Sequence, residues 1–167
     1  TKQSNQSDNT TVTNYLVAIP RQNFRMQVSY NLNNTITLRN RVEMLWYDNK
    51  AHPGNSSGQS LNSETGFLTF FDFICKPVLS SYSGFLRLQY FETDGYNSRI
   101  YAYENDVLYS YSIPAFFDKG FRYYLTLNYD LSKKLSFWLR WAQTIYQGKN
   151  SIGSGLDEIN GNKRTEL

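Results

Sequence analysis

The stretch FRYYLTLNYDLSKKLSFWLRWAQTIY, residues 121–146, decides the fold. Over residues 121–130, Phe, Tyr and Leu alternate with Arg, Tyr, Thr and Asn, and residues 135–146 repeat the pattern. Successive side chains of a β-strand point to opposite faces, so this period of two predicts two strands, each with an apolar and a polar face. The link at residues 131–134 is short enough for a tight turn, so the two strands are expected to form a hairpin.

The same alternation recurs, less regularly in the last two cases, over residues 24–31, 36–47, 66–76 and 84–91. Residues 99–113 predict a short hairpin that turns at Asn105-Asp106, and residues 14–20 predict a further strand or the beginning of the one from residue 23. No stretch has the spacing of an amphipathic helix. The sequence therefore predicts an all-β fold with about eight to ten strands in an antiparallel, up-and-down order.

The predicted connections alternate in length. Those at residues 31–35, 77–83 and 131–134 are tight, whereas those at 48–64 and 147–163 are long and rich in Gly, Asn and Ser. With a turn at Asn105-Asp106, the short connections lie at one end of the sheet and the long ones at the other. This layout is typical of outer-membrane barrels, which have short periplasmic turns and longer outer loops.

The composition of the chain argues against several classes of function. The 167 residues carry 17 Lys and Arg against 14 Asp and Glu, and the resulting charge of +3 is too small to indicate nucleic-acid binding. A single cysteine, Cys75, excludes an internal disulfide framework, and a single histidine, His52, excludes most sites built on imidazole groups. No apolar run approaches the roughly 18 residues of a membrane-spanning helix. We therefore expect neither an enzyme nor a cofactor.

Alternation by itself does not separate a membrane barrel from a soluble barrel or sandwich, whose apolar face points inward. Three features favour the membrane. The strands at 36–47 and 135–146 are long enough to cross a bilayer at a tilt, and every lysine lies in a turn, in a loop or at a strand end. Aromatic side chains gather near strand ends, as in the girdles of outer-membrane barrels. We expect a transmembrane β-barrel in a bacterial outer membrane.

The chain divides into a lead and a barrel segment. Residues 1–13, rich in Asn, Gln, Ser and Thr, predict a polar loop or a disordered lead. Residues 14–167 predict part of one outer-membrane β-barrel, and residues 164–167 resemble the beginning of a further strand. We therefore expect the barrel to continue beyond both ends of this sequence.

The two faces of the predicted strands carry different chemistry. The residues that we expect to face the lumen are Arg25, Arg39, Arg41, Glu43, Asp72, Arg87, Arg122 and Arg140. Those that we expect to face lipid are Leu38, Val42, Met44, Leu125, Leu127, Phe137, Leu139 and Trp141. Six guanidinium groups and two carboxylates in a lumen leave two alternatives. They pair across a plugged, structural lumen, which we favour, or they line a pore that prefers anions.

No motif indicates catalysis or metal binding. His52 lies in a turn-like stretch, Ala51-His-Pro-Gly, without a second histidine or a cysteine to complete a metal site. Gly153-Ser-Gly155 lacks the strand-to-helix frame and the lysine of a phosphate-binding loop. Cys75 ends a predicted strand and is interpreted as a small packing residue.

Four stretches stand out: GFLRLQYFETDGYNSRIYAYENDVLYSYSIP at residues 84–114, GFRYYL at 120–125, LSFWLRWAQTIY at 135–146 and SIGSGLDEI at 151–159. Together they resemble the C-terminal part of a Bacteroidota outer-membrane protein family, whose members are labelled helix-hairpin-helix domain-containing proteins. The resemblance covers residues 84–167 well and 23–83 loosely. It implies an outer-membrane barrel with a final strand after Leu167. Nothing in the sequence resembles the helix-hairpin-helix part, so no DNA-binding role is implied.

Two functions are compatible with these expectations. The first is a structural or accessory subunit of an outer-membrane assembly, in which the barrel anchors loops or periplasmic domains that bind other proteins. The alternative is a diffusion or uptake pore for small solutes. The expected partners are outer-membrane lipid and other outer-membrane or periplasmic proteins, and we expect this segment to bind no nucleic acid.

Overall fold

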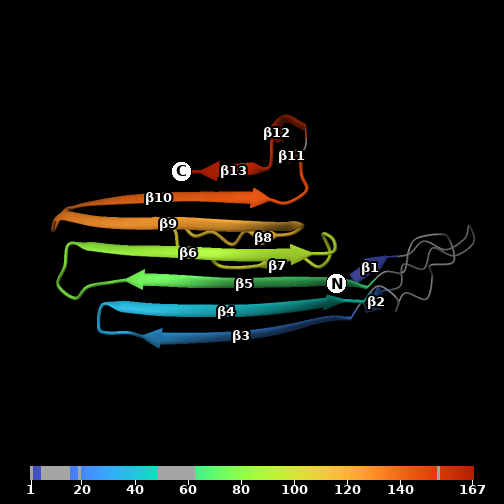
Figure 1. Ribbon diagram of the computed structural model, residues 1–167, viewed down its shortest axis with the longest axis horizontal. Coiled ribbons are helices and arrows are strands. Elements are labelled where there is room, and N and C mark those ends of the chain that lie inside the picture. The colour runs from blue at the N-terminus through green and yellow to red at the C-terminus, as the bar shows by residue number, and fades with distance from the viewer. Residues whose placement is uncertain (1, 5–15, 19, 49–62, 154) are drawn as a thin grey trace, which may run out of the picture.

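The computed structural model describes residues 2–4, 16–18, 20–48, 63–153 and 155–167. Most of them form one seven-stranded antiparallel sheet (Figure 1). Its strands, in spatial order, are β13 (Lys163–Glu166), β10 (Leu135–Tyr146), β9 (Lys119–Ser132), β6 (Tyr82–Thr93), β5 (Glu64–Cys75), β4 (Ile36–Tyr47) and β3 (Arg21–Asn31). The predicted all-β, antiparallel fold is confirmed.

Three small strand pairs complete the described structure. Strand β1 (Lys2–Ser4) pairs with β2 (Leu16–Ala18), β7 (Ile100–Tyr101) pairs with β8 (Ala115–Phe116), and β11 (Ser151–Ile152) pairs with β12 (Ile159–Asn160). The only helical element among the described residues is a 3-10 turn at Gly155–Asp157. None of the helical structure described is long and apolar enough to cross a membrane.

The strands of the large sheet run up and down in sequence order, with insertions only at the ends. The short connections, at residues 32–35, 76–81 and 133–134, lie at one end of the sheet. At the other end β4 ends and β5 begins, and the longer connections at 94–118 and 147–162 leave the sheet there too (Figure 1). The connection at 147–162 contains the β11–β12 pair, where the sequence predicted only a long connection.

The sheet has two chemically distinct faces, because its long strands keep the period-two alternation in register. One face, here called the polar face, carries Glu43 of β4, Asp72 of β5 and Arg87 of β6, and Asp72 pairs across strands with Arg87. The other, here called the apolar face, carries the intervening residues, such as Met44 and Leu88. The polar face is mostly buried, whereas many large hydrophobic side chains of the apolar face are exposed.

The polar face is buried because the segment between β6 and β9, residues 94–118 and here called the insert, folds across it. Strands β7 and β8 belong to the insert, and Glu104 forms an isolated bridge with Ser112. The predicted turn at Asn105-Asp106 was therefore wrong, since residues 105–111 all lie in the loop between the two arms of the hairpin. The hairpin does not join the large sheet.

This placement also corrects the strand count. The predicted eight to ten strands of one barrel included the hairpin at 99–113 and residues 14–20, but the large sheet has seven strands. Strand β2 pairs with β1 instead of the sheet. The described sheet is open, since β3 pairs only with β4 and β13 pairs only with β10.

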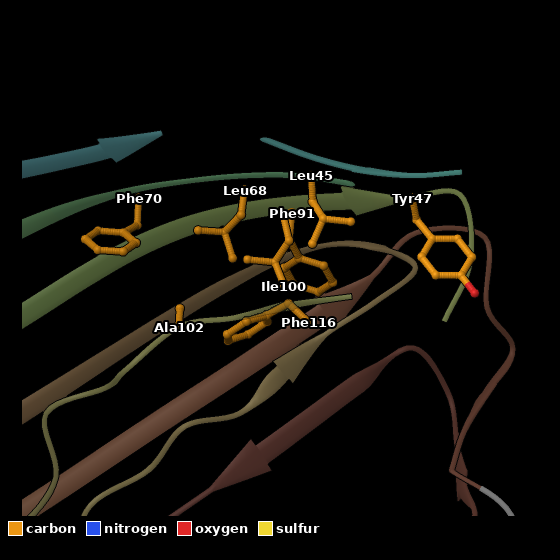
Figure 2. Close-up of a cluster of buried hydrophobic side chains, with 8 residues drawn as sticks. All are labelled: Leu45, Tyr47, Leu68, Phe70, Phe91, Ile100, Ala102 and Phe116. Carbon is orange, nitrogen blue, oxygen red and sulfur yellow. The ribbon is translucent and has the colours of Figure 1, made fainter. Parts of the chain in front are cut away.

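A hydrophobic cluster joins the insert to the sheet. Figure 2 shows its side chains, which come from β4, β5 and β6 on one side and from the insert on the other: Leu45, Tyr47, Leu68, Phe70, Phe91, Ile100, Ala102 and Phe116. The insert passes so close to β5 that a Cβ at Gly66 would lie 2.3 Å from the carbonyl oxygen of Ser98. Glycine at this position therefore permits the close approach of the two backbones.

Candidate functional site

Charged side chains of the polar face form three groups of ion pairs, of which the first lies at the edge of the sheet. Arg25 of β3 donates from Nε and Nη2 to the two carboxylate oxygens of Glu43, both at 2.8 Å. Asn23 donates to the same carboxylate at 2.9 Å. Register brings these groups together, because Arg25 and Glu43 are direct cross-strand partners. Glu43 is thus buried with its charge matched.

The second group lies at the centre of the sheet. Arg87 donates from Nε and Nη2 to Asp72 at 2.6 and 2.9 Å, and both side chains are buried. The Arg87 guanidinium also lies 3.6 Å from the centre of the Phe70 ring. Its remaining Nη1 donates to the carbonyl oxygen of Tyr103 at 2.6 Å. Arg87 therefore binds the insert as well as the sheet.

The third group has Glu104 of the insert at its centre. Arg122 of β9 donates to both oxygens of Glu104, at 2.7 and 2.9 Å, and Arg140 of β10 donates to Oε2 at 2.7 Å. Arg122 also donates to Thr144 at 2.7 Å and to Glu166 at 2.8 Å. Two cations on adjacent strands thus share one fully buried carboxylate.

These contacts fix the insert to the polar face at three successive residues. Tyr103 accepts from Arg87, Glu104 accepts from Arg122 and Arg140, and the backbone N–H of Asn105 donates to the hydroxyl of Tyr124 at 3.0 Å. Removing one partner of a buried ion pair leaves an uncompensated charge, which typically costs about 3–5 kcal/mol. The insert is therefore an integral part of the folded polar face.

The structure places all the predicted site residues on two faces of one sheet. Arg25, Arg39, Arg41, Glu43, Asp72, Arg87, Arg122 and Arg140 lie on the polar face. Leu38, Val42, Met44, Leu125, Leu127, Phe137, Leu139 and Trp141 lie on the apolar face. That the first face lines a lumen and the second contacts lipid stays a prediction.

The charge count of the polar face differs from the expected one. Three further carboxylates, those of Glu104, Asp106 and Glu166, contact its arginines. The expectation of two carboxylates beside six guanidinium groups therefore undercounted the carboxylates. The sequence does contain a signal for Glu104. Ile100, Ala102 and Glu104 occupy every second position, so all three lie on one side of a strand. That pattern does not show which surface this side covers.

Arg41 is the arginine of this set that has no carboxylate contact among the described residues. Its Nε and Nη2 donate to Oε1 of Gln27 at 3.0 and 2.7 Å. Its neighbour Arg39 lies 3.8 Å from Asp72, which is already paired with Arg87, and the Arg39 Nε has no hydrogen-bond partner. Among these six arginines, the charge without a carboxylate contact thus lies on β4, near the open edge.

Residues that could ligate a metal ion are scattered in the described part of the chain. The described residues contain no group of three or more His, Cys, Asp and Glu that could hold a metal ion. The free thiol of Cys75 is half-buried on the apolar face. His52 lies outside the described residues, as do most of the predicted lead at 1–13 and most of the predicted loop at 48–64.

Comparisons of the chain with protein-family models, with curated proteins and with solved structures find no match.

Proposed function

We propose that this chain is part of an outer-membrane β-barrel that acts as a structural or accessory subunit of an outer-membrane assembly. In this proposal the apolar face contacts lipid and the polar face, with the insert on it, lines the lumen. Strands beyond β3 and β13 close the barrel. The long connections at one end of the sheet present surfaces to other proteins. The proposed family is the Bacteroidota one that the sequence resembles.

The observation that carries this proposal is the reversed burial of the sheet. Charged residues such as Asp72 and Arg122 are buried, whereas Met26 and Leu139 on the apolar face are 51% and 55% exposed. An apolar surface that extends over six long strands would be unfavourable in water, at roughly 25 cal/mol per Å² of exposed apolar area. Lipid removes this cost.

The distribution of aromatic residues on the apolar face supports the same environment. Tyr30, Tyr82 and Tyr129 lie toward the end with short connections, and Trp46 and Tyr90 lie toward the other end. Amphipathic rings at two levels match the two interfaces of a bilayer. Arginines are confined to the polar face in these long strands, as a lipid-facing surface requires.

The insert favours an anchoring barrel over a wide pore. It covers β5, β6 and β9, and its ion pairs lie on residues that would otherwise line the lumen. Its other side carries the exposed side chains of Tyr101, Tyr103 and Ile113, which would extend further across a closed lumen. A lumen filled in this way leaves little room for a solute path.

The test is the behaviour of the full protein that carries this chain, isolated from the cell envelope. We expect it to need detergent for extraction and to migrate differently on gels before and after heating, as folded barrels do. Recovery of a monomeric protein without detergent would refute the proposal.

A pore for small anions is the second candidate, and the unpaired charge of Arg41 favours it. In planar bilayers, the anchoring barrel should show no conductance, whereas a pore should conduct with a reversal potential that indicates anion preference. The double substitution of Arg39 and Arg41 by Gln should then reduce that preference, because both cations lie outside the insert's ion pairs. A large cation-selective conductance would contradict both functions.

A further inference from the structure

The apolar face contains a hollow of about 500 Å³ near the end with short connections. It lies across β5, β6 and β9, around Gly84. Its walls are formed by Phe73, Cys75, Tyr82, Leu86, Leu127 and Tyr129. The surface of the hollow is almost entirely carbon, and no charged side chain lines it.

The hollow exists because Gly84 and Cys75, which have the two smallest side chains in this part of the face, are neighbours. Gly84 pairs with Cys75 on one side and with Leu127 on the other. A Cβ at Gly84 would lie 3.4 Å from Cδ2 of Leu127, which is an ordinary contact, and its backbone does not have a positive φ. A larger side chain would therefore fit without strain. The backbone does not require glycine here, so the open space is what distinguishes this position.

We propose that this hollow holds one acyl chain of a phospholipid whose headgroup lies at the short connections. The inference rests on the proposed outer-membrane location and adds a defined lipid site to it. The apolar lining of the hollow suits an acyl chain. A peptide segment, in contrast, would bring N–H and C=O groups that find no hydrogen-bond partner there. This difference favours lipid over an apolar segment of another protein.

Charge and polarity at the end of the hollow suit a phosphate headgroup. Tyr82 and Tyr129 are cross-strand partners at this end, and both are exposed. The turn that follows β9 carries two consecutive exposed lysines, Lys133 and Lys134. An anionic headgroup beyond the two tyrosines would lie at the same end of the sheet as these lysines. The lipid would therefore bind with its headgroup toward the short connections and its acyl chain in the hollow.

The experiment uses the full protein in phosphatidylglycerol vesicles that contain a phosphatidylglycerol with a photoactivatable acyl chain. After illumination, mass spectrometry locates the labelled residues. We expect the residues of the hollow that lie on the apolar face, Leu86, Leu125, Leu127 and Tyr129, to be labelled several-fold more than the rest of that face. Gly84→Leu should abolish this excess by filling the hollow. Cys75→Leu fills it from the neighbouring strand and should have the same effect. Val28→Leu enlarges an exposed residue on β3, remote from the hollow, and should leave the excess unchanged.

The outcomes separate this inference from the proposed function. Uniform labelling over the apolar face, or an excess that persists in both filled variants, would overturn the lipid site and leave the membrane location standing. Protection of the hollow while the surrounding face is labelled would assign it to a protein partner and also overturn the inference. Absence of labelling on the entire apolar face would overturn the proposed function together with the lipid site.

Discussion

The carboxylate of Glu104 and the guanidinium of Arg122 form two hydrogen bonds, at 2.7 and 2.9 Å, although Glu104 lies in the insert and Arg122 in the sheet. The pair is buried, and Arg140 of the next strand shares the same carboxylate. One acidic residue outside the sheet thus pairs with two cations within it. The folded state of the polar face depends on the insert for this reason.

Glu104→Gln should strongly destabilise the protein. The amide keeps the size of the side chain but removes the buried carboxylate that Arg122 and Arg140 share. Arg122 then keeps only the half-buried Glu166, and Arg140 keeps only Asp106 at 3.8 Å. Breaking a buried ion pair typically costs about 3–5 kcal/mol, and the remaining carboxylates should place the loss toward the lower end of that range. The free energy of unfolding, measured by urea titration of the protein in lipid vesicles, checks this expectation.

The matched control for Glu104 is Glu92→Gln, which alters an exposed ion pair with Lys119. Water screens that pair, so its loss should change stability little. Equal effects of the two substitutions would show that the Glu104 pairs do not hold the insert.

Leu125→Arg and Leu139→Arg should impair folding into bilayers, each by about 2–4 kcal/mol for a site near the midplane. Both residues lie on the apolar face, where a guanidinium would meet hydrocarbon in the proposed membrane location. The yield of the heat-modifiable, folded form in vesicles measures the effect.

The sequence suggests Thr126→Arg as a tolerated control, but Thr126 is buried beneath the insert, with Oγ1 3.5 Å from the carbonyl oxygen of Asn105. Ser136→Arg is the better control, since Ser136 is exposed and lies on the polar side of β10. Similar folding of all the variants would argue against a lipid-facing apolar surface.

Gly66→Ala should loosen the insert. The added Cβ would lie 2.3 Å from the carbonyl oxygen of Ser98, so the backbone of the insert has to move away from β5. Such overpacking typically costs about 1–3 kcal/mol. Limited proteolysis should therefore cleave residues 94–118 faster in this variant.

Gly84→Ala is the control for Gly66, because its new Cβ would lie 3.4 Å from Cδ2 of Leu127 and 4.0 Å from the carbonyl oxygen of Thr126, and would meet no backbone atom of the insert. If both alanine variants resist proteolysis equally, the insert does not need the close approach at Gly66.

Acid should weaken the contact between Asp94 and β5. Asp94 accepts hydrogen bonds from the hydroxyl of Thr65 at 2.6 Å and from its backbone N–H at 2.8 Å, and these hold the pKa of the Asp94 carboxyl below its usual value. A carboxyl with a lowered pKa contributes stability that is fully present above its unfolded pKa of about 3.9 and is lost as the pH falls through the folded value.

Asp94→Asn should therefore reduce stability near neutral pH and flatten its decline below about pH 4. Unfolding midpoints measured across this range test the expectation, with Asp130→Asn, at the opposite end of the sheet, as the control. An unchanged acid dependence in Asp94→Asn would show that this contact does not contribute.

The sequence by itself determined the strands and the faces on which their residues lie. The alternation over residues 121–130 and 135–146 was sufficient to place Arg122 and Arg140 on one face of the sheet and Leu125 and Leu139 on the other. The structure confirms this assignment of faces. This part was predictable because side-chain direction in a strand follows from backbone geometry between adjacent residues. The short connections were equally local, since their turn-forming residues lie next to each other in the chain.

Only the tertiary structure decided where the hairpin of the insert lies. Ile100, Ala102 and Glu104 alternate with Tyr101 and Tyr103 in the same way whether a strand joins a sheet edge or covers a sheet face. The choice depends on contacts distant in sequence, including the cluster around Phe91 and the burial of Arg122 against Glu104. Local alternation carries no information on which surface a strand will cover, because the free energy of that choice comes from packing and charge compensation between segments that meet only in the folded chain.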